Sequence, residues 1–124
     1  MCELERDLAM TTPMNFFVTE GNVDIYLSKL LGTFDRASRD NLFRLLTDEL
    51  SRMELTRAHL DNGERRVVDI NGRIRWQREE IERLKQATLP TDASTLLLET
   101  LEQTQMLLEA HCQRLRAACG PHQA

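Results

Sequence analysis

The chain contains few aromatic residues, no long apolar run and no excess of positive charge. Four Phe, one Tyr and one Trp make up 5% of the 124 residues, too few for a typical all-β sandwich or barrel. A membrane-spanning helix needs about 18 consecutive apolar residues, and no such run is present. The 16 basic and 20 acidic residues give a net charge of −4, which argues against broad nonspecific binding of nucleic acid. We therefore expect one helical domain outside the membrane.

Cysteine is also scarce, and no secretory signal is recognisable. Cys2, Cys112 and Cys119 are an odd number without the spacing of a disulfide scaffold, which favours a reducing compartment. A secretory signal begins with basic residues and continues into an apolar stretch. Residues 1–24 instead contain five acids and one base, so they account for the whole net charge of −4. These features predict a cytoplasmic protein in which residues 1–21 are an acidic, flexible leader.

Only three prolines are present, and their positions predict the layout. Because proline cannot donate the helical backbone hydrogen bond, Pro13, Pro90 and Pro121 are expected outside helix interiors. They bracket the proline-free stretches 14–89 and 91–120. Both stretches show the three- and four-residue spacing of apolar side chains that indicates helices.

The first proline-free stretch is predicted to form two helices, at about 22–31 and 36–86. Asn22 and Asp35 are expected to be their N-caps, and Gly32 is expected to end the first helix. The second helix contains six apolar residues spaced seven apart, the signature of a helix packed along its length against other helices. Those residues are Leu46, Met53, Leu60, Val67, Ile74 and Ile81.

Two signals within 36–86 compete with a continuous helix. Gly63 follows Asp61-Asn62 and allows a bend or a stop there, which leaves a monomeric three- or four-helix bundle open as a structural alternative. Asn71-Gly72 is a frequent β-hairpin turn. However, a turn at 71–72 would mix apolar and charged side chains on both faces of the hairpin, so we favour a helix in which Gly63 and Gly72 are the positions where a bend can occur.

The last helix is predicted over about 92–118. Thr91 or Asp92 is expected to cap it, and Gly120-Pro121 ends it before a tail at 120–124. The joining loop at about 87–91 is short, which makes the two long helices antiparallel neighbours. The predicted fold is therefore all-α: a short N-terminal helix followed by a long antiparallel helical hairpin, a coiled-coil-like bundle within one domain over 22–119.

Helix lengths then predict a dimer. At 1.5 Å per residue, a helix over 36–86 is roughly 77 Å long, whereas 92–118 covers only about 40 Å of it. The apolar residues Leu42, Leu46, Leu50 and Met53 are then left to the short first helix, and a second copy of the chain is the expected cover. The predicted core of the bundle or dimer comprises Leu42, Leu46, Leu50, Met53, Leu60, Val67, Ile74, Ile81, Leu98, Leu101, Leu108 and Leu115.

One segment carries a family resemblance. The run Asn22-Val23, Tyr26, Leu30-Leu31, Asp35, Arg39, Leu42, Leu45-Leu46 and Glu49 resembles a short helix-corner-helix element of small, uncharacterised bacterial helical proteins. It covers residues 22–53, about a quarter of the chain. The resemblance implies a small bacterial cytoplasmic protein and implies no activity.

Residues that suggest catalysis or metal binding have plainer explanations. Cys112 and Cys119 lie about 10.5 Å apart along one helix, too far to share a disulfide or a zinc ion, so we expect core packing. The alternative is a disulfide or metal site between two chains. His122 lies beyond the end of the predicted helix, in the tail. His59 is expected at the surface rather than as a general base. Because no catalytic motif is recognisable, we predict no enzyme activity, no catalytic or metal-ligating residue and no cofactor.

Trp76 lies among arginines, which raises the possibility of nucleic-acid contact. The segment 64–85 contains seven basic residues, but five interleaved acids, of which Glu64 is the first, leave a charge of only +2. Pairs such as Glu79 with Arg83 have the spacing that stabilises a solvated helix face. We therefore favour a protein partner contacted by Trp76 together with Arg73 and Arg75.

Phe16 and Phe17 in the leader either pack on the bundle or dock onto a partner. The function expected from the sequence is a non-enzymatic protein-interaction module, a regulatory or adaptor protein acting as a homodimer. Its partners would be a second copy and an unidentified protein. A nucleic-acid-binding regulator using 65–85 is the alternative.

Overall fold

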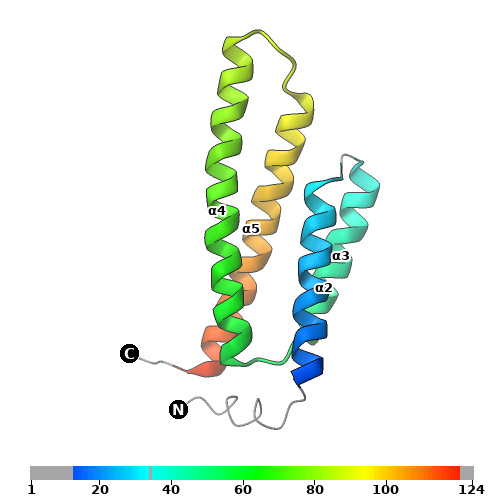
Figure 1. Cartoon of the computed structure of the whole chain (residues 1–124), viewed down its shortest axis with the longest axis vertical. Coiled ribbons are helices and arrows are strands. Elements are labelled where there is room, and N and C mark those ends of the chain that lie inside the picture. Colours follow the sequence, from blue (N-terminus) through cyan, green and yellow to red (C-terminus); the bar gives the residue numbers. More distant parts are fainter. Residues whose placement is uncertain (1–12, 34, 121–124) are drawn as a thin grey trace.

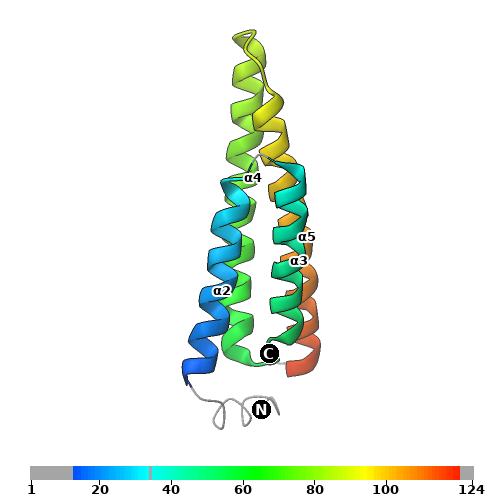
Figure 2. The ribbon, with the colours of Figure 1, turned by 90° about the vertical axis from the view of Figure 1, so that its right-hand side faces the viewer.

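The described part of the chain forms four helices, and the all-α prediction is confirmed. The computed structural model describes residues 13–33 and 35–120, and no strand occurs among them. The helices are α2 (Pro13–Leu31), α3 (Arg36–Arg52), α4 (Arg57–Gln86) and α5 (Asp92–Cys119). In Figure 1, α4 and α5 lie side by side with opposite chain directions, and α2 and α3 form a shorter pair beside their lower part. Figure 2 shows the upper ends of α4 and α5 extending beyond that shorter pair.

The chain is divided between α3 and α4, where the sequence predicted one helix over 36–86 that could bend near residue 63. The break lies at Met53–Thr56: the Met53 N–H bonds to the Leu50 carbonyl 3.3 Å away and ends α3, and the Thr56 hydroxyl accepts a hydrogen bond from the His59 N–H at 3.3 Å and caps α4. Such a cap satisfies a backbone donor that has no partner in the first helical turn. The helix continues without interruption through Gly63 and Gly72, so no turn forms at 71–72.

The first described helix is longer than predicted, because α2 begins at Pro13 rather than Asn22. Proline is favourable in the first turn of a helix, where its missing N–H has no intrahelical partner. Asn22 is therefore not an N-cap; it lies inside α2, and its side-chain amide donates to Glu49 of α3 at 3.3 Å. Residues 13–21 of the expected leader are helical, and residues 1–12 lie outside the described part. Asp35 caps α3 as predicted, accepting from the Ser38 N–H at 2.9 Å.

The lengthened α2 covers the apolar residues that were expected to need a second copy of the chain. Val23 and Leu30 of α2 are fully buried against Leu46 and Leu50 of α3 and Leu108 of α5. The length argument for a dimer was therefore wrong, because it rested on a shorter first helix and an unbroken second one. Among the twelve predicted core residues, Leu42, Val67 and Leu98 are half-buried and the following nine are buried: Leu46, Leu50, Met53, Leu60, Ile74, Ile81, Leu101, Leu108 and Leu115.

Close packing of α4 on α5 depends on one glycine. A Cβ atom on Gly63 would lie only 2.9 Å from the Cys112 Sγ atom, closer than such atoms normally approach. Cys112 and Cys119 are both buried, in agreement with core packing. Gly63 thus serves the contact between the two long helices and does not bend α4.

Within residues 13–33 and 35–120, none of the helices combines the length and the apolar character required to cross a membrane.

Candidate functional site

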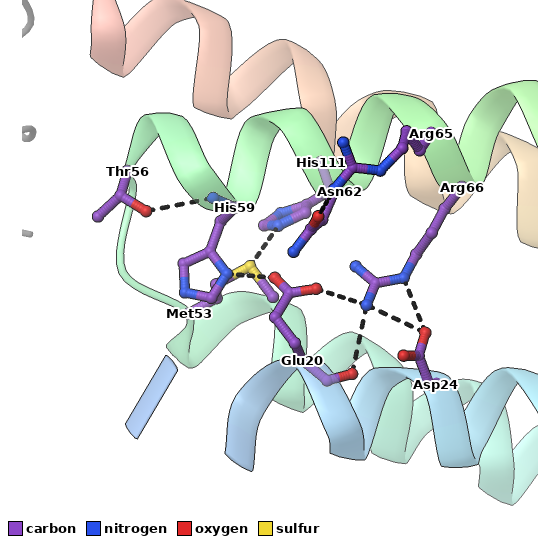
Figure 3. A network of polar contacts seen from close by, with 9 residues as sticks. All are labelled: Glu20, Asp24, Met53, Thr56, His59, Asn62, Arg65, Arg66 and His111. Atoms are coloured by element: carbon purple, nitrogen blue, oxygen red, sulfur yellow. Dashed lines mark hydrogen bonds and ion pairs between the residues drawn. The ribbon is translucent and has the colours of Figure 1, made fainter. Parts of the chain in front are cut away.

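A buried network of charged side chains joins the lower part of α2 to α4 (Figure 3). The carboxylate of Glu20 contacts His59 Nδ1 on one side and Arg66 on the other. Arg66 also donates to the Asp24 carboxylate at 3.1 Å and to the Glu20 carbonyl oxygen at 3.2 Å. Glu20 and His59 are only 6% and 3% exposed. The Asp24 side chain is 68% exposed, so the interior of the network consists of Glu20, His59 and the Arg66 guanidinium between them and Asp24.

The charges in this network favour an ionised Glu20. Burial alone would raise the pKa of this carboxyl group. The hydrogen bond with His59 and the positive charge of Arg66 together lower the pKa by more than burial raises it, so it lies below its usual range. The Phe16 ring covers His59, with 4.6 Å between the ring centroids. The sequence had placed Glu20 in a leader and His59 at the surface. The His59 prediction was wrong because the N-terminal extension of α2 buries that side chain.

A second buried histidine lies next to the network. His111 of α5 is 2% exposed, its Nε2 is 3.1 Å from the Met53 Sδ atom, and its Nδ1 is 3.1 Å from the Arg114 guanidinium. Burial and the positive charge of Arg114 together lower the pKa of His111 to about 4. The imidazole is therefore neutral near pH 7. The sequence places this histidine next to Cys112, three residues after Leu108 and four before Leu115, which is the spacing of the buried side chains of α5.

The ionisable groups of the network form contacts with one another. Among the described residues, no three or more His, Cys, Asp or Glu side chains are grouped so that they could hold a metal ion. Burial raises the pKa of the Cys112 thiol, which makes it a poorer nucleophile at neutral pH. Cys2 and His122, named above in connection with thiol or metal chemistry, lie outside the described residues. The network acts as a polar clamp between α2 and α4.

The outward side of α4 has a different character, because large apolar side chains are exposed there. Trp76 is 62% exposed and Val68 is 72% exposed. Next to them, where α2 ends, a groove of about 670 Å³ lies between α2, α4 and α5. Its lining is formed by Leu31, Val68, Asp69, Gly72, Arg73, Trp76, Gln77, Leu97 and Leu101. Of the predicted contact residues, Trp76 and Arg73 line this groove, while Arg75 is exposed but does not line it.

Most of the arginines around Trp76 are bonded to acidic side chains. Arg73 pairs with Asp69 at 3.1 Å, and Arg78 reaches Glu102 of α5 at 2.8 Å. Arg83 pairs with Glu80, three residues earlier, and not with Glu79 as the sequence suggested. Arg66 belongs to the buried network. The positive charge of 65–85 is thus largely balanced by neighbouring carboxylates.

Phe16 and Phe17 were considered either for packing on the bundle or for docking onto a partner, and their side chains differ in exposure. Phe16 is half-buried against His59, whereas Phe17 is 68% exposed, with its ring centroid 5.5 Å from that of Phe16. They lie near the start of α2, and neither lines the groove at Trp76. The structure therefore does not bring Phe16 and Phe17 together with the contact residues of α4.

No protein-family model, curated protein or solved structure that was compared with the chain matches it.

Proposed function

We propose that this chain is a protein-interaction module that works as a homodimer through the α4–α5 hairpin, and that it is not an enzyme. The observation that carries the proposal is the exposed apolar surface formed by Trp76, Val68 and the adjoining groove. Contiguous exposed apolar surface with a polar rim is typical of protein interfaces. Tryptophan in particular is enriched among the residues that contribute most to binding.

The adaptor or regulatory role forms part of the same proposal. The groove at Leu31 and Leu97 is concave and apolar, which suits the side chain of a partner protein. Cys112 is a buried free thiol, which is compatible with a reducing compartment, and we propose the cytoplasm.

Enzyme activity and nucleic-acid binding have less support. The titratable groups Glu20, His59 and Arg66 are bonded to one another, and the hollow of about 290 Å³ that Glu20 and Arg66 line has no histidine or cysteine in its lining. Nucleic-acid binding requires positive charge available for phosphates, whereas Arg73 and Arg78 are paired with carboxylates.

The mass of the full chain in solution, measured by sedimentation equilibrium over a range of micromolar concentrations, tests the proposal. We expect the wild-type chain to approach twice its mass of 14.4 kDa, and Trp76→Ala to shift the equilibrium towards the monomer. Met106→Ala is the matched control, because Met106 is 70% exposed on α5 and does not line the groove. A wild-type chain that stays at 14.4 kDa at every concentration contradicts the homodimer.

A further inference from the structure

The outer face of α4 carries an exposed seam that no described part of the chain covers. Seven residues on this face follow one another at intervals of three or four, and at about 100° per residue they lie within about 40° of one line along the helix. All seven are exposed: Asp61, Arg65, Val68, Gly72, Trp76, Glu79 and Arg83. In Figure 1, α4 forms the left-hand edge of the molecule, and no other labelled helix lies beyond it.

Gly72 at the centre of this seam has no evident function within its own chain. A Cβ atom there would meet nothing within 4 Å, and the backbone has ordinary helical geometry. Gly63, in contrast, is required by the packing of Cys112. Glycine destabilises a helix interior relative to alanine, so its presence at 72 calls for a compensating contact. A residue without a side chain allows another backbone to approach closely.

The charges of the seam are complementary to a second copy of the same helix. If a two-fold axis passes beside Gly72 and the helices are antiparallel, each residue before Gly72 faces the residue equally far after it. Asp61 then faces Arg83, and Val68 faces Trp76. Arg65 faces Glu79. A parallel pair would instead place each of these charges opposite its own copy, where like charges repel.

We infer that two copies of the chain pair antiparallel along the outer faces of α4, with the two-fold axis beside Gly72. The inference rests on the homodimer proposed above and specifies its surface and register. Residues 61–83 provide a contact about 33 Å long. Trp76 of each chain lies against Val68 of the other, at the edge of the groove that Val68 lines. Arg83 can bind Glu80 and a second carboxylate together, because guanidinium has five donors.

Charge reversal at one facing pair tests the register. Arg65→Glu alone places a new carboxylate against Glu79, twice per dimer, and Glu79→Arg alone places two arginines together in the same way. We expect each variant to weaken dimerisation by about tenfold or more. An equimolar mixture of the two variants should restore the wild-type affinity. In the mixed dimer, one facing pair joins the two new side chains and the other joins the two original ones. Both pairs therefore consist of opposite charges.

The control for Arg65→Glu is Arg44→Glu on α3. Arg44 and Arg65 are both exposed, and each bonds an asparagine side chain three residues earlier in its helix. We expect Arg44→Glu to leave the dimer unchanged. Circular dichroism of each variant verifies that the helices are retained.

Gly72→Ala provides an independent test. Alanine should raise the thermal stability of the monomer, because it favours the helix and meets no neighbour, and it should weaken the dimer by separating the two helices. If the wild-type chain dimerises but Gly72→Ala and the charge reversals leave its affinity unchanged, the inferred seam is wrong and the proposed homodimer stands. If the wild-type chain does not dimerise at all, both are wrong.

Discussion

The burial of His111 predicts that acid destabilises the fold well above the pH at which carboxylates titrate. The pKa of this histidine is about 4 in the folded protein and has an ordinary value of 6.5. Between these pH values the unfolded chain binds a proton at this position and the folded chain does not, so stability rises with pH. Each pKa unit corresponds to about 1.4 kcal/mol, and the full difference is therefore about 3 kcal/mol.

Unfolding by urea at fixed protein concentration measures this effect. Between pH 7 and pH 5 we expect the wild-type chain to lose about 2 kcal/mol through His111. The free energy of unfolding of His111→Gln should depend less on pH over this interval, whatever the stability of the variant at pH 7. Because the pKa of Glu20 is lowered, its contribution is present above its ordinary value of 4.5 and disappears as the pH falls through the lower folded value. The interval from pH 7 to pH 5 therefore separates the two groups.

The slopes of stability against pH distinguish packing from titration. Loss of a packing contact changes the stability of His111→Gln by a similar amount at every pH, whereas the loss of a titrating group changes the slope. If the variant loses as much stability as the wild type between pH 7 and pH 5, His111 is not the group responsible, and its burial as a neutral imidazole is refuted.

Two substitutions test the contacts between helices. Glu20→Gln should destabilise the chain by about 3 kcal/mol in urea unfolding, because it leaves the largely buried Arg66 side chain without its main counter-charge, whereas Asp24→Asn at an exposed position should cost less than about 1 kcal/mol. An equal loss of stability for the two substitutions would contradict the role of the network as a polar clamp between α2 and α4. Gly63→Ala should be destabilising in the wild-type chain, since the new Cβ meets the Cys112 Sγ atom, and stabilising by up to about 1 kcal/mol when Cys112→Ala removes that atom. If Gly63→Ala changes the free energy of unfolding by the same amount with Cys112 and with Cys112→Ala, this double-mutant cycle would show that the two residues are not in contact.

Periodicity in the sequence predicted helices and most of the core, and it failed at the corner between α3 and α4. Met53 ends α3 and Leu60 lies in α4, and both are buried, so the seven-residue spacing continues across the break. A count of apolar positions cannot distinguish a continuous helix from two helices whose buried faces keep the same register. The signal for the break was Thr56, a good N-cap residue three positions before His59.

The buried network was beyond prediction for a different reason. Glu20 and His59 are separated by 39 residues, and they meet because α2 extends back to Pro13 and lies beside α4. Local spacing shows neither the start of α2 nor the elements against which it packs. Pro13 itself was a usable signal, because proline is as typical of the first turn of a helix as of a boundary.

The two faces of α4 differ in the kind of interaction they can support, and this difference determines how fold and assembly should respond to salt. The inner face buries Leu60, Ile74 and Ile81, whose packing is insensitive to ionic strength. In the inferred seam, the outer face contributes exposed ion pairs on both sides of Trp76. Because exposed pairs are screened within about 8 Å at physiological ionic strength, and within about 3 Å at 1 M salt, we expect concentrated salt to weaken the dimer while the helices stay folded. A dimer held mainly by an apolar core would be strengthened or unaffected under the same conditions, so sedimentation and circular dichroism in about 0.1 M and 1 M salt distinguish the two.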